Sequence, residues 1–84
     1  MKRIIILASG SGSNAENIIK YFKNSNSISV VEVLSNKKDA KVLERAKRLG
    51  VNNSSFNREK LYTTDEVLNN LKNNADYIIL AGFL

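Results

Sequence analysis

Apolar residues recur along this chain in two alternating patterns. Short continuous runs rich in β-branched residues are typical of strands buried on both faces of a parallel sheet. Between these runs, apolar residues are spaced three and four positions apart, which is typical of helices that bury one face. The runs predict four strands, at residues 4–8, 28–34, 51–56 and 77–81, and the spaced repeats predict three helices, with apolar positions in 15–22, 42–49 and 67–71.

The predicted order is β-α-β-α-β-α-β with short connections. Right-handed crossovers turn this order into an α/β fold with a doubly wound, Rossmann-like parallel sheet. The simplest strand order is 3-2-1-4, in which the first and fourth strands are neighbours and the connections that leave them go to opposite faces. Ligands bind at such a switch point. The carboxyl ends of the strands at 4–8 and 77–81 are therefore expected to face one crevice.

Polar residues and glycines mark the predicted helix ends. Ser13 and Glu16 have the spacing of a capping box, which predicts that the first helix starts directly after the preceding loop. Asp39 is the predicted cap of the second helix, and Gly50 is its predicted stop in the C′ position. These signals leave only short loops between the helices and the strands.

The loop between the first strand and the first helix, residues 9–13, reads Ser-Gly-Ser-Gly-Ser. Backbone N–H groups at the start of a helix have no partner within the helix and attract anions. Gly10 and Gly12 would let the backbone turn sharply and approach a ligand without a Cβ in the way. The Ser13 hydroxyl would then donate to the anion instead of capping the helix. The alternative is a tight turn without a ligand, but a turn alone does not require five small residues, so the loop predicts an anion site.

The chain has 84 residues and a formal net charge of +5. A basic chain can bind nucleic acid, but here the lysines and arginines are scattered and no aromatic residues are interleaved with them. We therefore expect no nucleic-acid partner and a basic surface that favours small anionic ligands. The apolar stretch after Met1 is too short for a membrane span and lacks the cleavage region of a signal peptide, which predicts a cytoplasmic protein without membrane contact.

The chain contains no cysteine and no histidine. Disulfides are therefore excluded. Histidine is the commonest general acid or base and the commonest metal ligand, so a complete histidine-dependent active site cannot lie within these residues, and no metal site is expected.

Three interpretations of the crevice follow from the residues. Residues 10–15 match the G-x-G-x-x-A pattern of a dinucleotide site, but such a site also requires Asp or Glu after the second strand, where this chain reads Ser-Asn-Lys. Lys37 would favour a 2′-phosphate, so an NADP-binding oxidoreductase domain stays open. The second interpretation is a phosphate monoester site in which Gly12 and Ser13 donate hydrogen bonds and Asn14 is a polar gate. The third is a non-catalytic module that binds a nucleotide or phosphate.

Three motifs, in order along the chain, resemble one known family. They are SGSGSNAENII at 9–19, VLSNK at 33–37 followed by DA at 39–40 and LERA at 43–46, and DYIILAGF at 76–83. Together they resemble the N-terminal half-domain of the phosphoribosylglycinamide formyltransferases, the folate-dependent enzymes of purine biosynthesis. The resemblance covers essentially all of the chain but less than half of a typical family member. The loop G-x-G-S-N together with the strand ending S-N-K separates this family from dehydrogenases.

The resemblance implies roles for five residues. Gly12, Ser13 and Asn14 match the segment that holds the phosphate of the substrate, 5′-phosphoribosylglycinamide, in agreement with the predicted anion site. Arg58 matches an arginine that contacts 10-formyltetrahydrofolate, and a solvated loop arginine is the alternative. Leu84 falls where the folate-binding stretch of the family begins, and the last residue of a buried strand is the alternative.

The reaction that the resemblance implies is transfer of the formyl group of 10-formyltetrahydrofolate to the substrate amine, without a metal. The catalytic Asn, His and Asp of the family lie beyond Leu84. Residues 1–84 are therefore interpreted as the phosphate-binding half of one formyltransferase domain, truncated at the start of the folate segment and inactive alone. The strand at 77–81 would expose an edge through which such a piece self-associates unless a partner covers it.

Overall fold

The computed structural model describes residues 2–56, 73 and 75–82. The described elements alternate in the predicted order, and the third helix predicted around 67–71 lies outside the described residues. The bounds of the elements are β1 Lys2–Leu7, α1 Ser13–Phe22, β2 Ile28–Ser35, α2 Lys41–Arg48, β3 Asn52–Ser55 and β4 Tyr77–Leu80.

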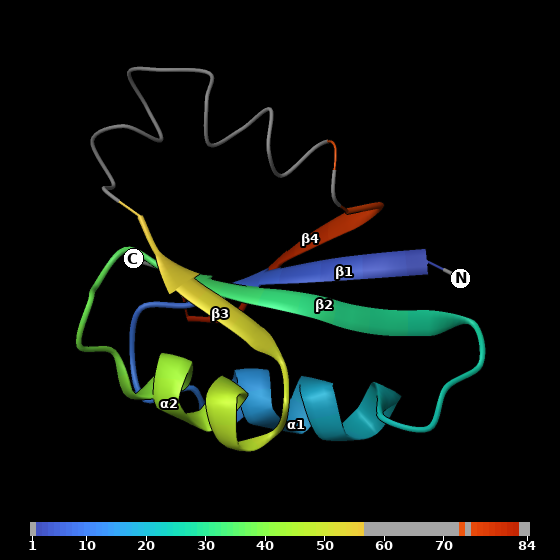
Figure 1. Cartoon of the computed structure of the whole chain (residues 1–84), viewed down its shortest axis with the longest axis horizontal. Helices are drawn as coiled ribbons and strands as arrows, with labels where there is room; N and C mark the ends of the chain where they lie inside the picture. Colours follow the sequence, from blue (N-terminus) through green and yellow to red (C-terminus); the bar gives the residue numbers. More distant parts are fainter. Residues whose placement is uncertain (1, 57–72, 74, 83–84) are drawn as a thin grey trace.

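The four described strands form one parallel sheet in the order β3-β2-β1-β4, as Figure 1 shows, which confirms the predicted fold class and strand order. β1 lies between β2 and β4, and Ile6 pairs with Val33 on one side and with Ile79 on the other. After the exposed Lys2 and Arg3, β1 is flanked by two strands and buried, and such a position favours apolar residues. This position explains the continuous apolar run of β1.

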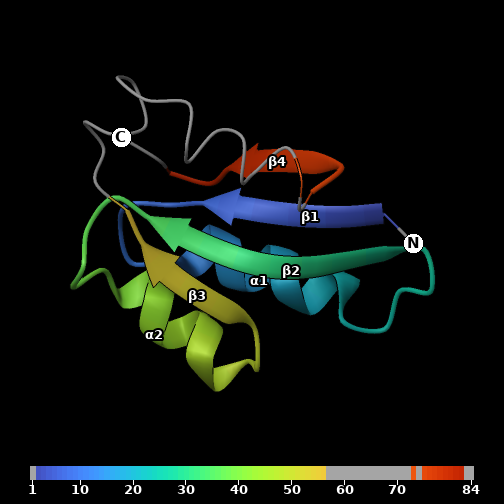
Figure 2. The same cartoon turned by 45° about the horizontal axis from the view of Figure 1, so that its top comes forward.

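Both described helices cover the same face of the sheet (Figures 1 and 2). Successive side chains of a strand point to opposite faces, so β1 contributes to a core on each side. On the face away from the helices, Ile5, Leu7 and Leu34 form a small buried cluster. The larger cluster, beneath the helices, consists of Ile4, Ile6, Ala8, Ala15, Ile19, Val33, Val42 and Ala46.

The start of α1 differs from the prediction. Gly12 is the N-cap, with φ 86° and ψ 16°, and no side chain caps the helix through a hydrogen bond within the described residues. Ser13 is the first helical residue, and the carboxylate of Glu16 pairs with Lys20 and Arg45 instead of turning back to the helix start. The predicted capping box is therefore wrong, because a left-handed glycine starts the helix and the glutamate has cationic partners.

One end of α2 contradicts the prediction and the other confirms it. The Ala40 N–H donates to the Lys37 carbonyl at 3.2 Å, and this turn makes Ala40 the N-cap, so the predicted Asp39 cap is wrong. Gly50 is the stop that the sequence predicts, with φ 76°. Its N–H donates to the Lys47 carbonyl at 3.2 Å, and the next N–H, that of Val51, donates to the Ala46 carbonyl at 2.9 Å. These two hydrogen bonds form a Schellman motif.

The two edges of the described sheet differ in polarity. β3 is short and polar and pairs with β2, in agreement with the weak edge strand predicted at 51–56. β4 pairs with β1, and within the described part of the chain its other edge has no partner strand. Tyr77, Ile78 and Leu80 of β4 are 55%, 39% and 65% exposed. The sheet therefore presents an apolar edge strand on the β4 side.

Asp76 fixes the start of β4 against β1. Its carboxylate accepts a hydrogen bond from the Arg3 backbone N–H at 2.7 Å and lies 3.5 Å from Nε of the Arg3 guanidinium, while the Asp76 N–H donates to the Arg3 carbonyl at 2.8 Å. The hydrogen bond from the Arg3 backbone lowers the pKa of Asp76, and the guanidinium charge lowers it further against partial desolvation. This attachment sets the register that brings the end of β4 beside the end of β1.

The described helices are short compared with membrane-spanning helices. α1 has 10 residues and α2 has 8, so neither helix of the described part is long and apolar enough to cross a membrane.

Candidate functional site

A small hollow lies where the carboxyl ends of β1 and β4 meet the loop that leads to α1. The Ala81 N–H donates to the Leu7 carbonyl at 2.9 Å, and the Ser9 N–H donates to the Gly82 carbonyl at 3.2 Å, so the two segments lie side by side. The structure therefore forms the predicted crevice from segments at opposite ends of the chain. The hollow has a volume of about 180 Å³ and is lined by Gly10, Ser11, Gly12, Ser13, Asn14, Ala81 and Gly82.

Gly12 is buried and packs against α2. A Cβ on Gly12 would lie 2.6 Å from the Cα and Cβ of Val42, and the backbone has the left-handed φ of 86° that side chains disfavour. The Val42 N–H also donates to the Gly10 carbonyl at 3.3 Å. The sequence predicts that Gly12 leaves room for a ligand, but in the structure its missing side chain leaves room for α2. The packing of α2 therefore fixes the shape of the loop.

Gly10 has the open surroundings that the sequence predicts for a ligand approach. No atom lies within 4 Å of the position that a Cβ on Gly10 would take, and its φ is outside the left-handed range. Gly10 is exposed and lines the hollow. A ligand in the hollow would therefore meet bare backbone at this residue.

Ser13 and Asn14 form the first turn of α1 and are both exposed. Because no described side chain caps α1, the first N–H groups of the helix are left to solvent or to a ligand. The positive end of the helix dipole lies at the same place. The first residues of α1 therefore line the hollow, and their N–H groups and polar side chains are donors of the kind that an anion with several acceptor oxygens requires.

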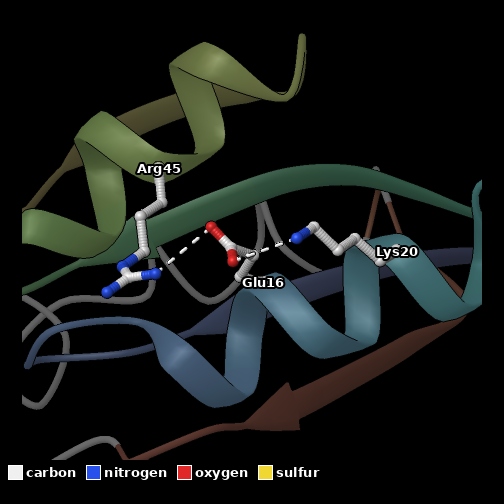
Figure 3. A network of polar contacts seen from close by, with 3 residues as sticks. All are labelled: Glu16, Lys20 and Arg45. Atoms are coloured by element: carbon white, nitrogen blue, oxygen red, sulfur yellow. Dashed lines mark hydrogen bonds and ion pairs between the residues drawn. The ribbon is translucent and has the colours of Figure 1, made fainter.

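Glu16 joins the two helices that position the loop. Its Oε1 lies 3.2 Å from Nη1 of Arg45 on α2, and its Oε2 lies 3.3 Å from Nζ of Lys20 on α1 (Figure 3). The hydrogen bond from Lys20 is the main cause that lowers the pKa of Glu16; Arg45 adds to it, and partial desolvation opposes both. The carboxylate therefore stays ionised and its charge is compensated close to the loop.

A hydrogen bond between Ser9 and Asn36 is a structural feature that the sequence reasoning missed. The Ser9 hydroxyl donates to Oδ1 of Asn36 at 2.6 Å, and the Lys37 N–H donates to Oγ of Ser35 at 3.1 Å. Ser9 and Ser35 are both buried. The Ser9–Asn36 bond joins the end of β1 to the turn after β2, while the Ser35 hydroxyl oxygen accepts a hydrogen bond within that turn. The sequence does show polar residues at the ends of two buried apolar strands. Because the carboxyl ends of parallel strands lie at the same edge of the sheet, such residues can be expected to lie close together.

The other predicted site residues lie away from the hollow or outside the described residues. Lys37 lies at the turn between β2 and α2 and does not line the hollow. Arg58 and Leu84, the residues predicted to contact the folate, lie outside the described residues. Among the residues that the structure describes, no group of three or more His, Cys, Asp or Glu side chains could hold a metal ion.

Comparisons with known proteins agree on one family. The family model described as formyl transferase matches residues 2–84. The trifunctional purine biosynthetic protein adenosine-3 of Chironomus tentans is 36% identical over 91 aligned positions, which cover 99% of this chain and 7% of that protein.

Solved structures show the same similarity. The structure of glycinamide ribonucleotide transformylase 1 from Symbiobacterium toebii superposes on this chain with a TM-score of 0.86 and 31% sequence identity. The match covers 100% of this chain and 42% of the Symbiobacterium chain. The structure of glycinamide ribonucleotide transformylase 1 from Geobacillus kaustophilus gives a TM-score of 0.84 at 35% sequence identity. This match covers 100% of this chain and 48% of the Geobacillus chain. This chain therefore spans less than half the length of these two structures. Because the family model matches nearly every residue of it, the chain belongs to the formyl transferase family.

Proposed function

We propose that this chain supplies the substrate-phosphate half of a folate-dependent formyltransferase of purine biosynthesis. The reaction transfers the formyl group of 10-formyltetrahydrofolate to the amine of 5′-phosphoribosylglycinamide. The observation that carries the proposal is the hollow at the junction of β1, β4 and the start of α1, in a chain of the formyl transferase family. The names of the similar proteins, which include glycinamide ribonucleotide transformylases, support the choice of substrate.

In this proposal the substrate phosphate lies against the start of α1. The N–H groups of Gly12 and Ser13 donate to phosphate oxygens, the Ser13 hydroxyl adds a donor, and the Asn14 amide closes the outer side. Support comes from the absence of a side-chain cap on α1 within the described residues and from the exposure of Ser13 and Asn14. An anion there gains hydrogen bonds to charged oxygens and the favourable end of the helix dipole.

The formyl donor is proposed to bind beyond the end of β4, with Arg58 and Leu84 as contacts. Bound 10-formyltetrahydrofolate supplies the formyl group, while residues 81–82 form the wall between donor and phosphate. Ala81 is half-buried, both residues line the hollow, and no atom lies within 4 Å of a Cβ position on Gly82. The substrate held by its phosphate would then present its amine toward the donor.

The chemical step requires a group that moves protons, and these 84 residues contain no histidine for it. Attack of an amine on a formyl carbon creates an oxyanion, which must be stabilised, and a protonated amine, which must lose a proton. Histidine is the most common residue for such a proton transfer. The chain has no histidine. The proposed role of residues 1–84 is therefore to bind and orient the substrate in the cytoplasm, with the proton-transfer groups supplied from outside these residues.

Calorimetry with two ligands tests the proposed function. The natural protein that contains residues 1–84 is titrated with a tetrahydrofolate analogue and, separately, with NADPH, alone and in the presence of the analogue. The proposal predicts saturable binding of the folate analogue and no displacement of that analogue by NADPH. Tight NADPH binding without folate binding would favour the oxidoreductase interpretation of the G-x-G-x-x-A pattern at 10–15 instead.

A further inference from the structure

A second and larger hollow lies on the other side of the Gly/Ser loop, at the turn between β2 and α2. It shares Gly10 and Ser11 with the hollow described above, so the loop separates the two. Its volume is about 580 Å³, within the range of roughly 300 to 1,000 Å³ typical of small-molecule sites. The lining residues are Ser9, Gly10, Ser11, Lys37, Lys38, Asp39, Ala40 and Lys41.

The charges around this second hollow are mostly positive and uncompensated. Lys37, Lys38 and Lys41 line it together with a single acid, Asp39. The ion pairs of the described residues use Arg3, Lys20 and Arg45 and none of the three lysines. Lysines that line one hollow repel one another through their charges, and a multiply charged anion bound in the hollow relieves this repulsion.

The turn that carries the lysines is fixed at both ends. The Ser9–Asn36 hydrogen bond of 2.6 Å holds its start to the end of β1, and the Ala40 N–H closes it on the Lys37 carbonyl at 3.2 Å. The hydrogen bond of 3.3 Å from the Val42 N–H to the Gly10 carbonyl holds its end to the loop. The backbone beneath the lysines is therefore already ordered before a ligand arrives, which lowers the entropic cost of binding.

We propose that this second hollow is an anion subsite that takes the phosphate chain of a nucleoside di- or triphosphate. Three lysines match a ligand that carries three or four negative charges better than a single phosphate. The volume leaves room for more than one phosphate group, and the open position of Gly10 lets a ligand approach the loop backbone. The subsite is separate from the pocket proposed for the substrate phosphate and does not depend on it.

The test compares two pairs of substitutions that remove the same charge from α2 and the turn before it. Lys38→Ala with Lys41→Ala removes two lysines that line the second hollow. Lys47→Ala with Arg48→Ala removes two exposed cations near the end of α2, which neither line the hollow nor form a described ion pair. The natural protein and both variants are titrated calorimetrically with ATP and with sodium tripolyphosphate at low ionic strength, where screening is weak.

The natural protein is expected to bind ATP at least as tightly as tripolyphosphate. The Lys38/Lys41 variant should bind ATP at least about tenfold more weakly, since each lysine gives a charge-assisted hydrogen bond, while the Lys47/Arg48 variant stays within about twofold. Both variants should keep the affinity of the natural protein for 5′-phosphoribosylglycinamide, which separates this subsite from the proposed function. Equal losses in the two variants, or no ATP binding by the natural protein, would overturn the proposal. Binding of tripolyphosphate without ATP would overturn the nucleotide assignment.

Discussion

Gly10 and Gly12 alternate with serines in the same loop, yet their surroundings give them different roles. The space around Gly10 is open, whereas the space where Gly12 would carry a Cβ is filled by Val42. The sequence pattern suggests ligand access at both positions. It does not reveal that a residue thirty positions away along the chain packs on one of them, because that contact depends on how α2 docks. Substitutions at the two glycines therefore test different properties.

Gly12→Ala should destabilise the protein, and Gly10→Ala should not. A Cβ at Gly12 overlaps the Val42 backbone and also disfavours the left-handed conformation, at a combined cost of about 2–4 kcal/mol in the free energy of unfolding. At Gly10 an added methyl group meets no atom, so that free energy should change by less than about 1 kcal/mol. Urea denaturation of the two variants measures both values. A Gly12→Ala variant as stable as the wild type would show that α2 does not pack on the loop as described.

The ends of the helices show that the glycine stop was predicted correctly from the sequence, whereas the side-chain caps were not. Gly50 ends α2 as predicted, because a left-handed glycine after a helix closes its own hydrogen bonds regardless of the rest of the fold. The capping signals at Ser13 and Asp39 failed. Gly12 is the N-cap of α1, and Glu16 forms an ion pair with Arg45 on the neighbouring helix. Caps that compete with tertiary contacts cannot be assigned from spacing alone.

The Glu16 bridge between α1 and α2 predicts a pH-dependent contribution to stability. The pKa of Glu16 is lowered in the folded protein, mainly by Lys20, so its ionised form is favoured by folding. This contribution is present above the ordinary carboxylate pKa, about 4.3, and is lost as the pH falls through the lowered value. Glu16→Gln should therefore lower Tm near neutral pH, and its difference from the wild type should vanish in strong acid.

Thermal melts of Glu16→Gln and of a control, Glu44→Gln, check this prediction. Glu44 lies exposed on α2 and forms no ion pair with the residues that the structure describes. The control should melt close to the wild type at every pH. A Tm difference for Glu16→Gln that persists unchanged into strong acid would contradict the role of the ionised bridge.

For the molecule as a whole, the order of the strands and the loop that lines the first hollow were predictable, whereas the second hollow was not. Alternation of strands and helices, right-handed crossovers and the apolar run of β1 lead to the order 3-2-1-4 without knowledge of any contact. They also place the loop opposite the end of β4. The lysines of the second hollow are neighbours in the sequence, but the hollow forms only because their turn lies beside the Gly/Ser loop, which the alternation of apolar and polar residues does not encode.

The exposed edge of β4 predicts self-association of residues 1–84 when they are produced alone. Leu80 is 65% exposed on a strand without a described partner on its outer edge, and charged residues at such an edge discourage strand pairing. Sedimentation of the 84-residue chain should show dimers or larger species, and Leu80→Lys should shift it toward the monomer. The control is Tyr21→Lys, since Tyr21 is 81% exposed on α1, away from the edge. An equal shift in the control would place the association elsewhere.

The same 84 residues should not transfer a formyl group. Loss of a positioned acid or base alone lowers the rate by about two to four orders of magnitude, and the chain has no histidine for this task. An assay with 10-formyltetrahydrofolate and 5′-phosphoribosylglycinamide should give no more product than a heat-killed sample. Measurable turnover would mean that the division between binding and proton-transfer residues is wrong.

In the proposed function, the start of α1 binds the phosphate of the substrate. The most direct measurement is a ¹⁵N–¹H spectrum of the natural protein during titration with 5′-phosphoribosylglycinamide. We predict saturable shifts of the Gly12, Ser13 and Asn14 amide signals, because their N–H groups would donate to phosphate oxygens. The Ser27 amide, next to β2 at the opposite end of the sheet, should not move. Saturable binding that leaves the amides of Gly12, Ser13 and Asn14 unshifted would show that the phosphate does not bind at the start of α1.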